Sequence, residues 1–219
     1  MKKILTVLMT VLFALSVSTV FAADVYNGSA DIQPKAMIEK NVSEGHSFSI
    51  SQTYVVECYK ADGTLRWSDT FNNLVPEAGL TKYLDATLKT GLATPVWYVG
   101  LVTGPSETGY ADTDTLASHA GWVEDITSYA GTRILWDPAA DSITCTGSGS
   151  CSLVDAAKSA FAIDSTCAAG CVISGAFMAS VSTGTSGTLL GVGAFTGGDR
   201  TVYEGDTLNV QITCTIAKS

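Results

Sequence analysis

The sequence predicts an all-β fold, an antiparallel β-sandwich or jelly-roll-like domain with one short helix after the first hairpin. From Ser47 onward, short runs rich in β-branched and aromatic residues alternate with Gly, Ser, Thr and Asp clusters, at the spacing of a sandwich or barrel. No segment repeats at a fixed period, and no helical pattern follows Gly91. We expect residues 47–219 to form a single domain with one substantial core.

Two segments precede this domain. The first begins with two lysines, continues as an apolar run over residues 4–21, and has Val20 and Ala22 at the spacing that a signal peptidase recognises. Residues 1–22 therefore resemble a bacterial-type secretory signal peptide, although the apolar run is also about long enough for an uncleaved anchor. Residues 23–46 are polar and lack periodicity, so we expect an arm or linker.

The first structural unit is a predicted β-hairpin. Residues 47–59, SFSISQTYVVECY, alternate apolar and polar side chains, as a strand with one buried face does. The same alternation returns in TLRWSDTF, residues 64–71. Asp62 and Gly63 lie between the two runs and are typical turn residues, so we expect the strands to pair.

The segment from Pro76 to Gly91 is the one convincing helix. Proline is favoured in a first helical turn, and glycine is favoured just beyond a helix end. Apolar residues recur between them at helical spacing: Leu80, Tyr83, Leu84 and Leu88. We expect this helix to pack on strands.

The rest of the domain is predicted to consist of strands and turns. Six further runs have β-type composition: VWYVGLVT (96–103), TRILW (132–136), SAFAI (159–163), VISGAFMASV (172–181), GTLLGVGAF (187–195) and DTLNVQITCTI (206–216).

The charge balance excludes one class of function. The formal net charge is −9, and removal of residues 1–22, which include Lys2 and Lys3, changes it to −11. Nucleic-acid binding depends on clustered Lys and Arg at phosphates, and the sequence contains no basic patch. We expect no nucleic-acid partner.

All six cysteines lie after the proposed signal peptide, as expected for a disulfide framework in an oxidising compartment. Short Gly-containing loops favour Cys145 with Cys151 and Cys167 with Cys171. The remaining pair would be Cys58 with Cys214. A disulfide between them would close a large loop and stabilise the fold by roughly 4 to 5 kcal/mol. The alternative, a zinc site, fits poorly because neither local spacing is C-x2-C and no histidine pair follows.

The stretch ADTDTLASHAGWVED, residues 111–125, has the highest density of chemically active side chains. Its candidate metal ligands are Asp112, Asp114, His119 and Glu124, although the D-T-D-T run lacks the further oxygens and the glycine of a calcium loop. A Ser-His-Asp set built on Ser118 and His119 is disfavoured, because adjacent side chains on extended chain point to opposite sides. No G-x-S-x-G motif occurs to present a serine on a strained turn.

A structural interpretation of this stretch is favoured over a chemical one. The stretch is rich in Asp, Thr and Ser, whose side chains form hydrogen bonds with the local backbone and order turns. We therefore expect His119 and Trp122 to pin the loop to the core, with no catalytic residue, cofactor or metal.

The aromatic residues suggest a further alternative. A sugar-binding platform needs exposed rings, and the candidates are Trp67, Trp97, Tyr98, Trp122 and Trp136. Core or half-buried strand positions are favoured for them. A glycosidase would need a pair of carboxylates, and the sequence singles out no pair.

The middle of the chain resembles a group of small proteins encoded among virion structural genes of tailed phages and prophages. The resemblance covers about residues 55–216, and its most specific part is the block from Asp114 to Glu124. It also includes Trp67, Asp69, Phe71, Asn73, Gly79, the W-Y-V-G-L run at Trp97, Tyr129, Arg133, F-x-I at Phe161, G-A-F-M at Gly175 and G-D-T-L-N-V at Gly205. It implies a compact β-rich domain used in assembly or surface decoration, and it fixes no catalytic residue.

These observations together predict an exported, non-enzymatic structural or surface protein that acts through protein-protein contacts, in assembly, decoration or adhesion. We expect it to be secreted, periplasmic or at the cell surface, or associated with a particle, with no membrane span after signal cleavage. The low charged fraction of 15 percent fits a surface that packs against neighbours. The alternatives are a carbohydrate-binding or carbohydrate-active protein and a metal-dependent hydrolase.

Overall fold

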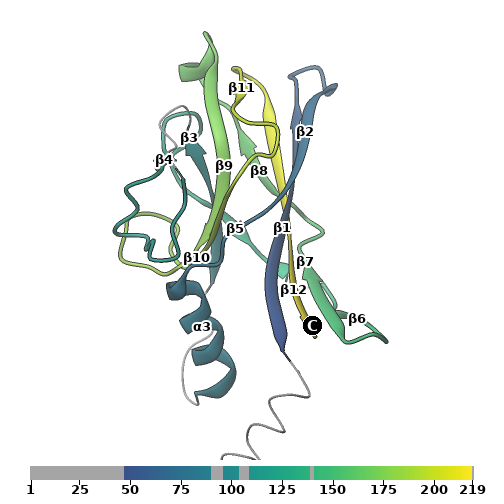
Figure 1. Cartoon of the computed structure of the whole chain (residues 1–219). Helices are drawn as coiled ribbons and strands as arrows, with labels where there is room; N and C mark the ends of the chain where they lie inside the picture. The colour runs from purple at the N-terminus through teal and green to yellow at the C-terminus, as the bar shows by residue number, and fades with distance from the viewer. Residues whose placement is uncertain (1–46, 90–95, 104–108, 139–140, 219) are drawn as a thin grey trace, which may run out of the picture. The chain divides into compact units, whose positions relative to one another are not determined.

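The computed structural model describes residues 47–89, 96–103, 109–138 and 141–218. In this part of the chain, two six-stranded antiparallel sheets pack face to face as a β-sandwich, with one α-helix at one end of the layers (Figure 1). The predicted fold class is therefore confirmed. The proposed signal peptide, residues 1–22, and the polar arm, residues 23–46, lie outside the described residues.

The first sheet has the strand order β2-β1-β12-β7-β6, and β8 also pairs with β12. The pairing of β1 with β12 runs along the whole of both strands, from Phe48 opposite Lys218 to Tyr59 opposite Thr207. The strands of this sheet are β1 (Phe48–Tyr59), β2 (Leu65–Asn72), β6 (Thr144–Thr146), β7 (Ser150–Val154), β8 (Ser159–Ala162) and β12 (Thr207–Lys218).

The second sheet has the order β10-β9-β3-β4, with β11 also paired with β9 and β5 with β3. Its two central strands, β9 and β3, pair with each other and each carry two shorter strands on the outer side. The strands are β3 (Trp97–Thr103), β4 (Val123–Asp125), β5 (Ile134–Trp136), β9 (Cys171–Ala179), β10 (Leu189–Ala194) and β11 (Arg200–Val202).

The main core lies between the sheets and follows from the alternation of the long strands. On β1 every second side chain from Gln52 to Cys58 is buried, and β12 repeats the pattern from Leu208 to Ile212. These side chains pack with residues of the opposite sheet such as Leu101.

The turn between β1 and β2 forms at the predicted position. The Lys60 N–H donates to the Thr64 carbonyl oxygen at 2.8 Å, and the Gly63 N–H donates to the Lys60 carbonyl oxygen at 2.8 Å. Gly63 has φ +81°, a conformation that glycine adopts without a Cβ penalty. The Asp62 side chain accepts from the Thr64 N–H at 2.9 Å, which orders the turn further.

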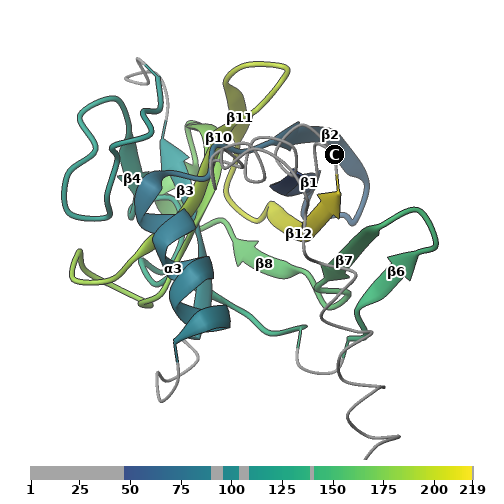
Figure 2. The same ribbon diagram turned by 60° about the horizontal axis from the view of Figure 1, so that its bottom comes forward.

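Helix α3 (Glu77–Leu88) begins after Pro76, as predicted, and its C-cap is Lys89, whereas the predicted end at Gly91 lies outside the described residues. Gly79 is the buried residue of this helix and lies against β10. A Cβ at this position would be 2.5 Å from the carbonyl oxygen of Leu190. Glycine thus lets the helix approach the sheet closely (Figure 2). The described residues contain no helix that is long and apolar enough for a membrane span.

Two of the three expected disulfides are present. Cys145 is bonded to Cys151 across the β6–β7 hairpin, and Cys167 to Cys171 across a turn at Gly170, which has φ +95°.

The expected pairing of Cys58 with Cys214 is wrong, and both thiols are free. In the β1–β12 ladder Cys58 lies opposite Leu208, whereas Cys214 lies opposite Gln52. Six residues of strand separate the two positions, about 20 Å. A disulfide needs Cα atoms within about 7 Å.

Four short strands, β4, β6, β7 and β11, were not predicted. They are three to five residues long. The β6–β7 hairpin occurs in the Gly/Ser-rich sequence CTGSGSC, which has no apolar alternation. Strands β4, β7 and β11 each pair with a longer strand that offers its backbone groups, and β6 pairs with β7 in turn, which is a tertiary effect.

Candidate functional site

The loop of residues 109–122 covers the outer face of the second sheet (Figure 1). Side chains alternate between the two faces of a strand, so Phe177 of β9 points away from the core that its neighbour Met178 helps to form. Phe177 instead packs with Trp122 and Leu116 from the loop. A second, smaller core therefore lies under this loop.

Trp122 is the centre of the loop's internal contacts. Its side chain is 2 % exposed, and its ring centroid lies 5.2 Å from that of Phe177. The indole Nε1 donates to Asp114 Oδ2 at 3.0 Å, and the same oxygen accepts from the Ala111 N–H at 3.1 Å. His119 stacks on the indole with centroids 3.8 Å apart, and its Nδ1 lies 3.0 Å from the Trp122 carbonyl oxygen.

A buried ion pair lies next to this loop. The Arg133 guanidinium donates to both Glu124 oxygens, Nε to Oε1 at 2.8 Å and NH2 to Oε2 at 2.7 Å. It also donates to the carbonyl oxygens of Val181 at 2.8 Å and Gly184 at 2.9 Å, and its charge lies 5.2 Å from the centroid of Phe177. The fork geometry of arginine suits this convergence of acceptors from strand β4 and from the loop between β9 and β10.

The four weak metal candidates have separate roles. Asp114 accepts from the Trp122 indole, Glu124 pairs with Arg133, and His119 stacks on Trp122. Asp112 has an exposed side chain, and its carbonyl oxygen accepts from the Glu77 N–H at the start of α3. Among the described residues, no three His, Cys, Asp or Glu side chains are grouped as a metal site requires.

Ser118 and His119 also do not act together. The Ser118 backbone forms a tight turn with Thr115, and Ser118 lines an open hollow of about 430 Å³ together with Tyr110, Thr113 and Asp114. The His119 Nδ1 is directed to the Trp122 carbonyl oxygen instead. This geometry is that of an ordered loop, and the role of His119 and Trp122 as its pins remains a prediction for stability measurements.

The five candidate aromatics occupy different places. Trp67 packs on Phe195 of the main core, and Trp122 is buried under the loop. Trp97 and Trp136 are paired across β3 and β5, where Tyr98 is half-buried next to them. They are core or half-buried strand residues, as favoured from the sequence, and they do not share one exposed face.

Trp97 and Trp136 do share a cavity of about 190 Å³ that sequence reasoning missed. Lys82, Tyr83 and Ala86 line it from α3, and Leu153 of β7, Leu190 of β10 and Cys214 of β12 line it from the sheets. The residues come from both sheets and the helix, so no local pattern marks the cavity in the sequence.

A buried hydrogen-bonded group holds the helix at this cavity. Gln52 is fully buried on β1; its Nε2 donates to the Tyr83 hydroxyl at 3.2 Å, and its Oε1 accepts from Asn73 Nδ2 and from the Tyr54 hydroxyl. The Asn73 backbone N–H donates to the Gln52 carbonyl oxygen at 3.1 Å. The position of Tyr83 is therefore fixed by the first sheet.

The two free thiols differ in exposure, since Cys58 is buried and Cys214 is half-buried at the cavity. Burial raises the pKa of Cys214 to about 11, although hydrogen bonds with Tyr83 and Gln52 lower it somewhat. Burial and the neighbouring Asp206 carboxylate raise the pKa of Cys58 to about 12. A thiol reacts as the thiolate, so neither cysteine has the properties of a nucleophile near neutral pH.

The outer face of α3 carries a row of exposed leucines. Leu80, Leu84 and Leu88 are 43 %, 53 % and 75 % exposed. They follow one another at intervals of four residues and therefore form one stripe along the helix. The helix was predicted from four apolar residues at helical spacing. Of these four, only Tyr83 packs against the main core, and the three leucines do not.

Searches with this chain match no protein-family model, no curated protein and no solved structure. The geometry of the described residues therefore carries the functional argument.

Proposed function

We propose that this chain is an exported structural protein that works through protein-protein contacts, and that the leucine stripe of α3 is a contact between two copies. The observation that carries the proposal is the stripe itself. Three large apolar side chains in one row on a helix surface are typical of a helix-helix contact. Each leucine that loses its remaining exposure contributes on the order of 1–2 kcal/mol.

The geometry of α3 favours a second copy in antiparallel orientation. A two-fold axis at Leu84 brings Leu80 opposite Leu88 of the second copy. The same arrangement places the positive end of each helix dipole beside the negative end of the other, which is the favourable orientation.

The export part of the proposal is supported by the sequence and by the disulfides. Residues 1–22 have the pattern of a signal peptide. The bonds Cys145–Cys151 and Cys167–Cys171 are typical of proteins that mature in an oxidising compartment. The resemblance of residues 55–216 to phage virion proteins agrees with a subunit of a repeating assembly.

The experiment is a measurement of oligomeric state by analytical ultracentrifugation over a range of concentrations. Leu84→Lys places a charge at the centre of the stripe, and we expect it to convert the assembly to monomers. The matched control is Leu65→Lys, at the start of β2, where the leucine is 51 % exposed. We expect Leu65→Lys to keep the wild-type state.

Two results would contradict the proposal. One is a wild-type protein that stays monomeric at every concentration. The other is a Leu84→Lys variant that keeps the assembly while circular dichroism shows an unchanged fold.

A further inference from the structure

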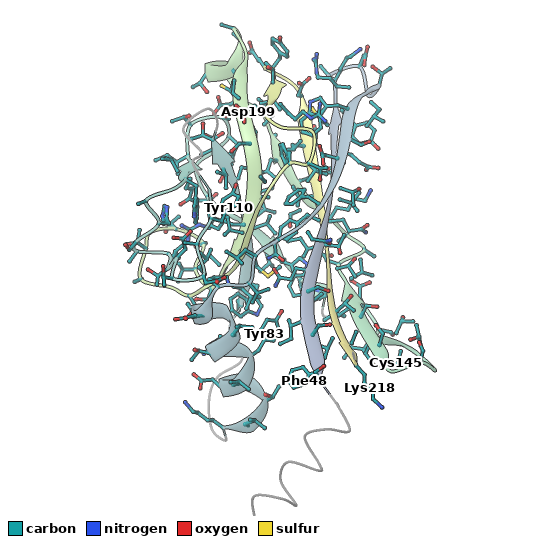
Figure 3. The ribbon with its side chains drawn as sticks, viewed as in Figure 1. Phe48, Tyr83, Tyr110, Cys145, Asp199 and Lys218 are labelled. Carbon is teal, nitrogen blue, oxygen red and sulfur yellow. A yellow bond between two sulfur atoms is a disulfide. The ribbon has the colours of Figure 1, made fainter. Side chains whose placement is uncertain are left out.

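The cavity between α3 and the two sheets has no role in the contact proposed above. Lys82, Tyr83 and Ala86 line it from one face of the helix, whereas the leucine stripe occupies another face. Figure 3 shows Tyr83 at the same end of the sandwich as Phe48 and Lys218, and far from Asp199 at the opposite end. The cavity therefore needs a separate explanation.

The size and walls of the cavity match one aromatic ring. Its volume is about 190 Å³. An apolar cavity of roughly 150 Å³ in a protein stays dry and binds benzene. The indoles of Trp97 and Trp136 and the side chain of Leu153 provide mainly apolar walls, against which a planar ring packs well.

The cavity also carries a positive charge. Lys82 is half-buried at the wall, and it forms no ion pair with a described residue. No carboxylate lines the cavity. The positive charge therefore favours an anionic group on the ligand.

We infer that this cavity is a binding site for a small aromatic carboxylic acid. The ring lies between Trp97, Trp136 and Leu153, and the carboxylate pairs with the ammonium group of Lys82. Binding is non-covalent, because the raised pKa of Cys214 keeps its thiol protonated near neutral pH. The inference does not depend on the proposed contact between α3 helices.

The test uses the mature full chain and two matched probes, phenylacetate and its neutral amide, phenylacetamide. Isothermal titration calorimetry and the fluorescence of the tryptophans measure binding. We expect saturable binding of phenylacetate at a 1:1 ratio, with Kd on the order of 0.1–1 mM for so small a ligand. Phenylacetamide is expected to bind at least five-fold more weakly.

Two pairs of variants separate the contributions. Lys82→Gln should weaken phenylacetate at least five-fold and leave phenylacetamide unchanged, whereas Lys89→Gln, outside the cavity, should change neither. Ala86→Leu fills the cavity without loss of helix propensity and should abolish binding of both probes. Thr81→Leu adds the same side chain at an exposed helix position that does not line the cavity, and should change nothing.

Each of three outcomes would overturn the inference. No saturable binding to the wild-type chain would remove the site. Binding that survives Ala86→Leu, in a variant with a wild-type circular dichroism spectrum, would place the ligand elsewhere. Equal affinity for the acid and the amide would refute the carboxylate assignment. The oligomeric state is measured separately, so failure of the helix contact would be seen independently.

Discussion

The His119 imidazole stacks on the Trp122 indole with ring centroids 3.8 Å apart, and the His119 Nδ1 lies 3.0 Å from the carbonyl oxygen of that same tryptophan. One side chain thus contacts both the ring and the backbone of its partner. The histidine that most suggested catalysis in the sequence thus has its closest contacts with a tryptophan.

This relationship predicts a stability effect for His119→Ala. We expect a loss of about 1 kcal/mol, because an aromatic pair contributes about 0.5–1.5 kcal/mol beyond area burial. His119→Phe keeps the stack and loses only the hydrogen bond, so it should be less damaging. Urea unfolding measures both variants, and an unchanged unfolding midpoint for His119→Ala would refute the pinning role.

Arg133→Lys should be strongly destabilising although it keeps the charge. Lysine cannot reproduce a fork that reaches Glu124, Val181 and Gly184 together, so buried acceptors would lose their donors. We expect a loss of about 2–4 kcal/mol in the free energy of unfolding. Lys158→Gln removes the more exposed Lys158–Glu57 pair and should cost less than about 1 kcal/mol. Equal effects of the two variants would contradict this account.

Gly100→Ala tests the packing beneath the loop. A Cβ at Gly100 would lie 2.3 Å from Phe177 Cζ, so the ring would have to move against Trp122. We expect a loss of about 1–3 kcal/mol in unfolding free energy. The loss should shrink in a Phe177→Leu background, where the side chain is smaller. Gly147→Ala, with no atom within 4 Å of the added methyl, is the control.

The free thiols predict a defined labelling pattern. Cys58 and Cys214 are the two free cysteines. A thiol reagent should therefore label both in the unfolded chain and react slowly with the folded one. Non-reducing peptide mapping should link Cys145 with Cys151. A peptide that contains Cys58 bonded to Cys214 would contradict the register in which β1 pairs with β12.

Stability should fall at alkaline pH because folding raises the pKa of both thiols. The usual thiol pKa is 9.0, whereas folded Cys214 has about 11 and Cys58 about 12. The thiol contribution is thus fully present below pH 9, and it is lost as the pH rises toward these folded values. Between pH 9 and 10 each thiol contributes an average slope of about −1 kcal/mol per pH unit, because the unfolded thiol loses about 0.7 of a proton more than the folded one.

Urea unfolding at pH 8, 9 and 10 measures this slope. Cys214→Ala should make the slope less steep by about 1 kcal/mol per pH unit, which is the contribution of one thiol. Peptide mapping after each experiment verifies that the two disulfides have not exchanged. An identical slope in the variant would contradict the role of Cys214.

Much of the fold could be predicted because it depends on local patterns. Three features depend only on residues that are neighbours in the sequence: the alternation in β1 and β2, the Asp62–Gly63 turn, and the start of α3 after Pro76. The unpaired state of Cys58 and Cys214 could not be predicted, because it depends on how β1 and β12 align. Pairing by elimination ignored the offset of six residues between Cys58 and Cys214.

The candidate sites were predicted less completely for the same reason. The loop of residues 111–125 was recognised by its composition, yet its main partners, Phe177 and Arg133, come from other strands and loops. The cavity at Cys214 joins both sheets and α3, and no spacing in the sequence indicates it.

The position of β12 has a consequence for how the protein is made. This strand is the last of the described domain, and it pairs with β1, the first strand, and with β7 and β8. The first sheet is therefore incomplete until the ribosome has finished almost the whole domain. A chain with such long-range pairing folds slowly. A chain whose first sheet is still incomplete would suit the export proposed above.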